Sequence, residues 1–399
     1  MKQESTPALL ILNQMAGPLT WELADDLGKI LGSVALLTGH PDTLYKGSTA
    51  SVRVFAATSY QRSSFVRRVR SWMRYLWDAL LWVWSWPGET PLLLYSNPPI
   101  LPWLGWILRV FRGQRYAVVI HDIYPDILVR LGLIPMPFAR IWYWCNRRAY
   151  QSADLVITLG ERMADALSRQ FDPGRTATGV IHVIYPWADT EFIQPLPKDK
   201  NPFAKEHGQE NKLTAMYSGN MGIGHDIETI LRAALCLRDE PSIHFMFIGD
   251  GPKRRVVEDF IKNYALNNVT LLQWQPEEML PYSLTTADVS FVSLEPELSG
   301  LAVPSKFFYY LAAGSPVILI SDGQSEIGDI IEKYECGWVC QPDREDEIVQ
   351  HLSRLKQDNG ELERLKRRSR EVAERIGSRK NNSIRMSTLL ANWVESCGC

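Results

Sequence analysis

Two glycine-containing turns in this chain have residues suited to binding phosphate groups. Asn220, Gly222 and Gly224 follow one apolar run and precede a helical pattern, and Lys253 and Arg254 follow a second such turn. Glycines let backbone N–H groups approach a ligand without a Cβ in the way, and a nearby cation offsets negative charge. Both turns are predicted to lie between a strand and a helix, where phosphate is commonly held. The alternative is that each is an ordinary tight turn followed by a solvated first helical turn.

An acidic loop later in the chain has a second set of residues that could act in chemistry. Glu295 and Glu297 follow an apolar run, and a small-residue turn leads into a helix predicted over 305–313. Gly314 stands where a helix C-terminus favours a residue with positive φ, and 317–320 has the composition of a buried parallel strand. This order places the loop at the carboxyl edge of a parallel sheet. The alternative is an ordinary βαβ unit with acidic surface residues.

A histidine ends another apolar run in the first half of the chain. His121 and Asp122 directly follow the run 116–120. Polar side chains at the end of a buried strand are well placed to face a ligand. A lone histidine beside an aspartate is more often structural than catalytic, so both roles stay open.

Strand and helix patterns alternate through both halves, which predicts an α/β protein. At 399 residues the chain is long for one hydrophobic core, so two domains are expected. The stretch 186–212 is rich in Pro, Asn, Lys and Glu and poor in apolar periodicity, as an interdomain segment would be. We expect a first domain over 1–188, a linker over 189–212, a second domain over 213–378 and a terminal helix over 379–399.

Tryptophan is concentrated in the first domain. Of the 14 tryptophans, seven lie in one short region: Trp72, Trp77, Trp82, Trp84, Trp86, Trp103 and Trp106. The pattern over 64–86 predicts an amphipathic helix flanked by arginines, and 98–111 is a second apolar stretch that ends in arginines. Neither run reaches the roughly 18–20 residues that a membrane-spanning helix needs. Tryptophan and arginine on apolar helices are typical of helices lying in a membrane surface. The alternative is that both helices cover the sheet, with their tryptophans in the core.

The composition limits the expected partners and compartment. A net charge of −2 gives no reason to expect nucleic acid. The six cysteines show neither metal-ligand spacing nor a disulfide framework, and the N-terminal residues have no signal-peptide pattern. We therefore expect reduced thiols and a cytoplasmic protein. No Asp-x-Asp metal motif occurs in a suitable loop.

Several motifs resemble those of one enzyme family. E-L-S-G-L at 297–301, followed by A-A-G-S-P-V-I at 312–318, resembles the donor-binding signature of the large retaining glycosyltransferase family 4, which has the GT-B fold. H-D-I-Y-P-D at 121–126 and V-P-S-K at 303–306 resemble a subgroup that acts in surface-polysaccharide assembly. The resemblance implies two Rossmann-like domains that face each other across a cleft, with a C-terminal helix that crosses back to the first domain.

The resemblance also implies roles for the matching residues. Glu297 and His121 would contact the transferred sugar. The chemistry of the transfer adds a cation for the departing diphosphate, and either Lys306 or Lys253 could supply it. A second glutamate usually binds the ribose in this family, and its position here is Tyr309, so ribose recognition departs from the family pattern. Lys253 or Arg254 could replace an arginine that relatives have in the first glycine turn. The residues expected to hold the donor are Asn220, Gly222, Gly224, Lys253, Arg254, Trp274, Gln275, Ser299, Gly300, Leu301, Ala302 and Tyr309.

The resemblance implies retaining transfer of a sugar from a nucleotide-diphosphate sugar, with no metal and no other cofactor required. UDP is the expected nucleotide. The expected acceptor is a lipid-linked or other membrane-associated saccharide in polysaccharide or glycolipid synthesis. The expected location is the cytoplasmic face of the plasma membrane, where the protein would be peripheral. Two alternatives stay open: a catalytically silent scaffold at the membrane, and a nucleotide-sugar 2-epimerase of the same fold.

Overall fold

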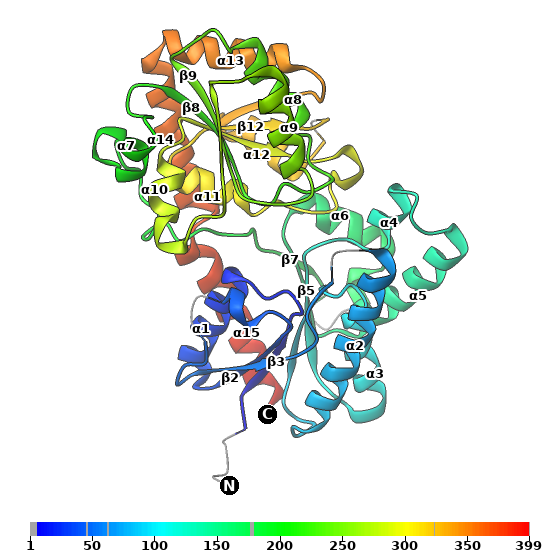
Figure 1. The fold of residues 1–399 in the computed structure, drawn as a ribbon. Helices are drawn as coiled ribbons and strands as arrows, with labels where there is room; N and C mark the ends of the chain where they lie inside the picture. Colours follow the sequence, from blue (N-terminus) through cyan, green and yellow to red (C-terminus); the bar gives the residue numbers. More distant parts are fainter. Residues whose placement is uncertain (1–5, 45–46, 62–63, 176–178, 323, 399) are drawn as a thin grey trace. The chain divides into compact units, whose positions relative to one another are not determined.

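The computed structural model describes residues 6–44, 47–61, 64–175, 179–322 and 324–398. These residues form two compact units that alternate strands with helices (Figure 1). Unit 1 comprises the described parts of Met1–Tyr185 and Asn382–Cys399, and unit 2 comprises those of Pro186–Asn381. The division into two α/β units agrees with the fold class expected from the sequence.

Unit 1 is built on a parallel sheet with the strand order β3-β2-β1-β4-β5-β6-β7 in its described part. Each central strand is buried and apolar along its whole length, as expected when helices cover both faces of a sheet. The strands are β1 (Leu9–Leu12), β2 (Val34–Thr38), β3 (Val52–Ala56), β4 (Leu92–Tyr95), β5 (Tyr116–Ile120), β6 (Leu155–Thr158) and β7 (Ile181–Val183).

Two helices of unit 1 have an end that the sequence marks with a capping residue. Gly32 follows the first helix with a φ of 83°, and the Ser64 hydroxyl accepts a hydrogen bond from the Arg67 N–H at the start of the second. The helices are α1 (Pro18–Leu31), α2 (Phe65–Trp84), α3 (Leu101–Arg112), α4 (Asp126–Arg130), α5 (Met136–Ser152) and α6 (Glu161–Gln170), with short turns η1 (Pro41–Thr43) and η2 (Pro173–Arg175).

The C-terminal helix α15 (Arg379–Cys397) packs most of its length in unit 1. The Ser383 hydroxyl donates to Asp26 at 2.6 Å, and the Asn382 amide donates to the Tyr185 carbonyl at 3.1 Å. The end of the chain therefore returns to the first unit, as the family resemblance implied.

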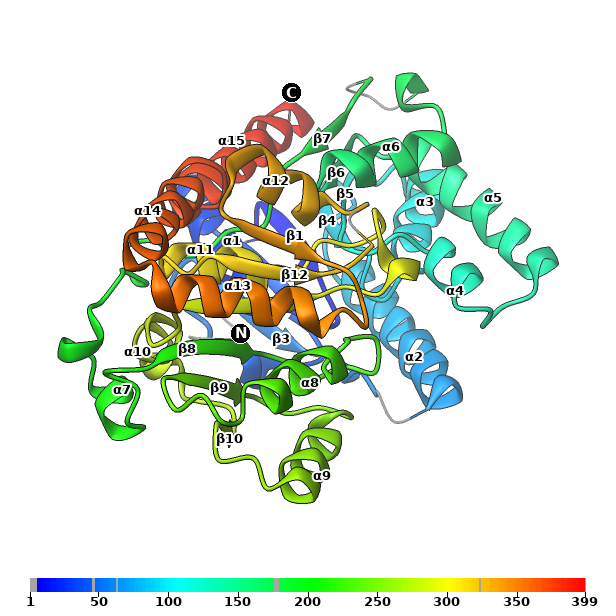
Figure 2. The same ribbon diagram turned by 90° about the horizontal axis from the view of Figure 1, so that it is seen from above.

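Unit 2 is a second parallel sheet with the strand order β10-β9-β8-β11-β12-β13 in the described residues, and Figure 2 shows β10, β9 and β8 side by side in that order. Its strands are β8 (Leu213–Ser218), β9 (Ile243–Ile248), β10 (Val269–Leu272), β11 (Val289–Ser293), β12 (Val317–Ile320) and β13 (Gly337–Cys340). Its helices are α7 (Pro202–Glu206), α8 (Glu228–Cys236), α9 (Arg254–Tyr264), α10 (Leu280–Thr285), α11 (Lys306–Ala312), α12 (Glu326–Tyr334), α13 (Glu345–Gln357) and α14 (Asn359–Ile376), with short turns η3 (Lys198–Lys200), η4 (Glu277–Met279) and η5 (Pro296–Leu298).

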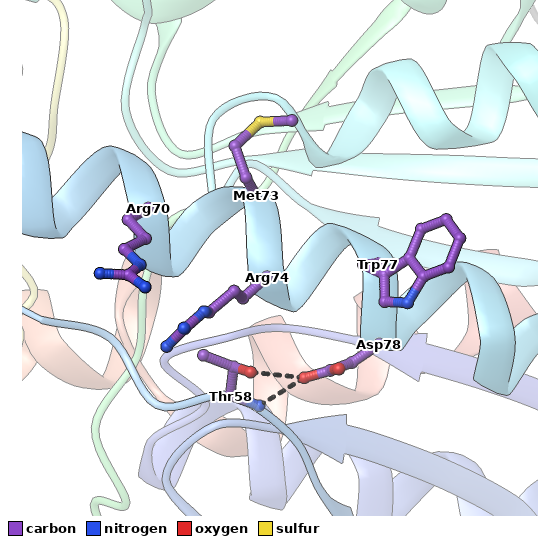
Figure 3. A pocket seen from close by; sticks show the side chains of 6 residues that line it. All are labelled: Thr58, Arg70, Met73, Arg74, Trp77 and Asp78. Carbon is purple, nitrogen blue, oxygen red and sulfur yellow. Dashed lines mark hydrogen bonds between the residues drawn. The ribbon is translucent and has the colours of Figure 1, made fainter.

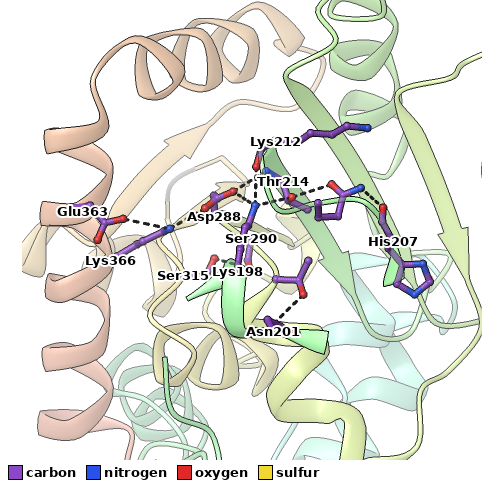
Figure 4. A network of polar contacts seen from close by, with 12 residues as sticks. Lys198, Asn201, His207, Lys212, Thr214, Asp288, Ser290, Ser315, Glu363 and Lys366 are labelled. Atoms are coloured by element: carbon purple, nitrogen blue, oxygen red, sulfur yellow. Dashed lines mark hydrogen bonds and ion pairs between the residues drawn. The ribbon is translucent and has the colours of Figure 1, made fainter. Parts of the chain in front are cut away.

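The stretch 189–212, expected as a linker, is packed into unit 2 (Figure 4). Lys198 forms an ion pair with the buried carboxylate of Asp288, whose other oxygen lies 2.8 Å from the Lys366 ammonium of α14. The buried Asn201 side chain caps α7 by accepting from the N–H groups of Phe203 and Ala204. The polar composition of this stretch suggested a linker between domains. Instead, the side chains of Lys198 and Asn201 bond to residues more than 80 positions away in the sequence.

Candidate functional site

The glycine turn of unit 2 follows β8 and packs directly on the turn after β9. A Cβ added to Gly249 would lie 2.2 Å from the Gly219 carbonyl oxygen, and one added to Gly251 would lie 2.6 Å from that of Met221. Both positions also have positive φ. The backbone of the second glycine turn thus packs on the backbone of the first turn. The sequence pattern alone could not tell this packing role from a role in binding phosphate.

The first turn, residues 219–224, has backbone N–H groups that are free to bind a ligand. The N–H groups of Asn220, Ile223 and Gly224 have no acceptor among the described residues. The Gly222 N–H donates to Nδ1 of His225, 3.3 Å away. Unpaired N–H groups grouped on one turn at the end of a buried strand are suited to an anionic ligand.

Lys306, the first residue of α11, lies against this turn. A Cβ added to Gly219 would lie 3.3 Å from Lys306 Nζ. The ammonium donates to the Tyr217 hydroxyl at 3.0 Å and lies 4.1 Å from the centroid of that ring. No carboxylate in the described structure pairs with it, and burial lowers the pKa of Lys306 to about 7.

Tyr217 and His225, which the sequence patterns did not single out, complete this cluster. The Tyr217 hydroxyl lies 2.6 Å from His225 Nδ1 and 2.7 Å from the Asn220 carbonyl oxygen. Burial, followed by the charge of Lys306, lowers the pKa of His225 to about 4, so the ring is neutral at physiological pH. Both residues flank the glycine turn in the sequence, which was the available signal for them.

The two other cations near the turn are already engaged. Lys253 donates to the His225 carbonyl oxygen and to Glu228, at 2.7 and 2.8 Å. The Arg254 guanidinium donates to the carbonyl oxygens of Gly249 and Leu272, at 2.7 and 2.9 Å. Both residues therefore bind protein groups at the ends of neighbouring elements, whereas Lys306 has no acidic partner within the described ranges.

The acidic loop after β11 also reaches the glycine turn. A Cβ added to Gly224 would lie 3.0 Å from a carboxylate oxygen of Glu295. Burial, and then the neighbouring charge of Glu297, raises the pKa of Glu295. Glu297 lies in η5, and its side chain is partly exposed. The structure thus places Glu295 beside this turn, while the predicted contact of Glu297 with the transferred sugar stays a prediction.

The remaining predicted donor residues of the loop have varied surroundings. The Ser299 hydroxyl donates to Asp322 at 2.9 Å, and Gly300 has a φ of 72°. Leu301 is buried, so its side chain belongs to the core, while Ala302 and Tyr309 are partly exposed.

Two further predicted residues follow β10 at the edge of the unit 2 sheet. The Trp274 ring is 56% exposed, which leaves a face available for stacking. The Gln275 amide donates to the Gln273 carbonyl oxygen at 3.0 Å.

His121 lies in unit 1, at the carboxyl end of β5. Its backbone N–H donates to the Ser96 hydroxyl at 2.9 Å, and its ring meets the Tyr95 ring edge-on with centroids 5.1 Å apart. Burial lowers the pKa of His121 to about 4 and raises that of Asp122 to about 6. The imidazole is therefore neutral near pH 7.

Neighbouring helices of unit 1 expose a large set of apolar side chains. Helix α3 packs against both α2 and α5, and the rings of Trp106 and Trp144 are 5.6 Å apart. For Trp72 the alternative of core packing holds, because its side chain is only 3% exposed. We define the apolar face of unit 1 by its exposed members: Val66, Met73, Trp77, Leu81, Trp84, Ile107, Val110, Phe111, Phe138, Ile141 and Trp144.

Basic residues on α2 border the apolar face. A pocket of about 520 Å³ is lined by Thr58, Arg70, Met73, Arg74, Trp77 and Asp78, whose side chains are drawn in Figure 3. The Thr58 N–H and hydroxyl donate to the Asp78 carboxylate at 2.9 and 2.6 Å, so that acid is engaged. Arg70 and Arg74 are exposed and have no acidic partner among the residues that the structure describes.

Two further findings concern membrane-spanning helices and metal-binding groups. No helix in the described part of the chain combines enough length with enough hydropathy to cross a bilayer. Within the same residues, no group of three or more His, Cys, Asp or Glu side chains is arranged to hold a metal ion.

Two parallel sheets flanked by helices define the GT-B class of α/β fold. The solved structure of HepE from Anabaena, in complex with UDP and glucose, matches 97% of this chain and 99% of its own with a TM-score of 0.71. Its sequence identity is 15%, so this likeness shows the fold alone.

The sequence comparisons identify the family. The model of "Glycosyl transferases group 1" matches residues 199–372, and that of "Glycosyl transferase 4-like domain" matches residues 32–187. The chain therefore belongs to the GT-B glycosyltransferases of the family 4 type.

Two relatives match part of the chain. A Pseudomonas aeruginosa protein named as a probable glycosyltransferase, WbjE, is 29% identical over 62% of this chain and 61% of its own. A protein of Escherichia coli K12 named for glycosyl transfer in colanic acid biosynthesis, WcaI, is 26% identical over 59% of this chain and 58% of its own. The matched region thus spans about three fifths of either relative.

Proposed function

We propose that the protein transfers a sugar from a nucleotide-diphosphate sugar, with the diphosphate held at the glycine turn of unit 2. The observation that carries this proposal is the combination of unpaired N–H groups on residues 220–224 with Lys306, whose ammonium has no carboxylate partner among the described residues. A diphosphate would supply both the oxygen acceptors and the negative charge that this arrangement lacks.

Sugar transfer requires the site to stabilise the positive and negative charges that separate in the reaction. Breaking the bond between the anomeric carbon and the phosphate leaves positive charge on the sugar and negative charge on the diphosphate. The turn N–H groups and Lys306 are suited to the departing diphosphate. Glu297 is proposed to bind hydroxyl groups of the transferred sugar. We propose retention of the anomeric configuration, with the acceptor attacking from the side of the leaving group.

UDP-sugars are the proposed donor class. The solved complex of HepE with UDP and glucose supports this choice, because HepE has the same fold. The exposed ring of Trp274 offers a stacking face for a base. Tyr309 stands where the family has its ribose-binding glutamate, so a hydroxyl would take the place of a carboxylate in ribose recognition.

The proposed acceptor is a lipid-linked saccharide in polysaccharide synthesis. The name of WcaI, which refers to colanic acid biosynthesis, supports the polysaccharide context. The apolar face of unit 1 supports a lipid-linked rather than a free acceptor, because such a surface suits attachment to the bilayer in which the acceptor is anchored.

We also propose that unit 1 binds peripherally to the cytoplasmic surface of the membrane. Trp77 and Trp84 on α2 are 61% and 59% exposed, and the exposed residues Arg70 and Arg74 lie on the same helix and line one pocket with Trp77 (Figure 3). Exposed aromatic rings insert at headgroup depth, and unpaired cations bind anionic lipid.

A turnover assay tests the function. The protein is incubated with radiolabelled UDP-sugars and bacterial membranes, and free UDP and labelled lipid are measured. We expect both products from one donor. Free UDP with no labelled lipid would overturn the proposed acceptor, and release of neither product from any nucleotide sugar would favour a silent scaffold. An epimerised nucleotide sugar would instead identify a 2-epimerase.

A further inference from the structure

The Lys306 ammonium is held by a phenol rather than by an acid. Its hydrogen bond goes to the Tyr217 hydroxyl at 3.0 Å, and the same ring lies beneath it at 4.1 Å. That hydroxyl is in turn held by His225 Nδ1 and the Asn220 carbonyl oxygen. A lysine in these surroundings loses hydration without gaining a countercharge, and this favours the neutral amine.

We propose that at pH 8 Lys306 is mostly uncharged in the empty site and takes up one proton when a diphosphate binds at the glycine turn. The proton comes from solvent and bonds to Nζ, and the resulting ammonium donates to phosphate oxygens. The phosphate provides a negative charge beside Lys306, whereas the Tyr217 hydroxyl is neutral. This inference rests on the proposed function, since it concerns the same diphosphate site.

The other titratable groups around the turn must be compared with Lys306 as sources of a change in protonation. They come from β8, the turns before α8 and α9, the loop after β11, and α11: Tyr217, His225, Lys253, Glu295 and Tyr310. Burial raises the pKa values of Tyr217 and Tyr310, and it lowers that of His225 to about 4. Burial also raises the pKa of Glu295, which makes this carboxyl the rival source of proton uptake.

The sign of the pH dependence follows from the lowered pKa of Lys306, which is about 7 in the empty site. Above that pH the free protein must gain the proton, so uptake should reach about 0.9 proton per diphosphate at pH 8. At lower pH Lys306 is already charged, and uptake through this group should fall toward zero. The affinity should accordingly decrease as pH rises, with a slope that approaches a factor of ten per pH unit.

Calorimetry with UDP tests the proposal directly. UDP is titrated into the full chain at pH 8 in buffers of different ionisation enthalpy, because the dependence of the observed heat on that enthalpy counts the protons exchanged. At this pH the terminal phosphate of UDP is fully ionised, since its second pKa is about 6. We expect uptake of about 0.9 proton in the native protein and in Glu295→Gln, and close to none in Lys306→Gln.

A matched control is available in Lys333→Gln. Lys333 also lies over a tyrosine ring, that of Tyr334 at 5.2 Å, but it is exposed, and its substitution should leave the uptake unchanged. UDP binding by the native protein with no buffer dependence would overturn the inference while leaving the proposed function intact. Loss of the uptake in Glu295→Gln would reassign it to that carboxyl. Absence of UDP binding altogether would overturn both the inference and the UDP site.

Discussion

The Lys253 ammonium lies 2.8 Å from Oε2 of Glu228 and joins the turn before α9 to the first residue of α8. Lys306, beside the same glycine turn, is bonded to a tyrosine hydroxyl instead. Two lysines beside one turn therefore have different partners. Lys253 stabilises the turn, whereas Lys306 is available to a ligand.

Substitution of each lysine by glutamine should separate these roles. Lys306→Gln should weaken UDP binding about 10-fold or more, because it removes a charge-assisted hydrogen bond worth about 1.5–3 kcal/mol. Lys253→Gln should weaken it less and should lower the melting temperature, because Glu228 loses its partner. Titration calorimetry at pH 7 and thermal unfolding measure the two effects. Equal losses of affinity would contradict the distinction.

Glu297→Ala should lower turnover by roughly 100-fold if the carboxylate binds the transferred sugar in the transition state. The matched control is Glu332→Ala, which removes an exposed glutamate from α12 of the same unit. Release of UDP from the donor in the presence of membranes measures both. Unchanged turnover in Glu297→Ala would exclude this carboxylate from the reaction.

His121→Asn should lower turnover without changing its pH profile between about pH 6 and 8. Burial lowers the pKa of His121 to about 4, so a neutral ring acts across this range, and asparagine retains a neutral polar group. Initial rates across the range provide the measurement. A profile that gains or loses an ionisation would show that His121 changes protonation during turnover.

Double substitution of Trp77 and Trp84 by serine should release the protein from vesicles of anionic lipid, with its melting temperature retained. Both rings are exposed, so their loss removes membrane contact rather than core packing. Trp274→Ser, which removes an exposed ring from unit 2, is the control and should stay bound. Trp72→Ser should instead unfold unit 1, at a cost of about 3–5 kcal/mol. Full vesicle binding by the double variant would remove these rings from the proposed membrane contact.

Asp288→Asn should destabilise unit 2 by about 3–5 kcal/mol, because it leaves Lys198 in a mostly buried site without its countercharge. Asp259→Asn is the control: its pair with Arg255 is exposed, and its loss should change the free energy of unfolding by less than about 1 kcal/mol. Urea unfolding measures both, and a loss for Asp288→Asn no larger than that of the control would contradict a structural role for the network.

The same carboxylate should make unit 2 sensitive to acid. Burial alone would raise the pKa of Asp288, but Lys198 and Lys366 together hold it below its ordinary value. Its contribution to stability is therefore present at neutral pH and is lost as pH falls through that lowered value.

The local sequence determined the positions of the strands and helices, because hydrophobic patterns and capping residues act between neighbouring residues. Apolar runs predicted the buried strands, Ser64 and Gly32 stand at helix ends, and Gly314 has the positive φ expected of a residue after a helix. The division into two α/β units and the family signature were predictable for the same reason: both are patterns along the chain.

Only the tertiary structure decided which side chain meets which. Gly249 proved to be a packing partner of Gly219, Trp72 proved to be core while Trp77 is surface, and Lys198 found its partner Asp288 ninety residues away. These outcomes depend on contacts between strands and helices that are distant in sequence, so no local pattern encodes them. The cation at the glycine turn is likewise a property of the fold, because Lys306 meets Tyr217 only when β8 and α11 pack in one unit.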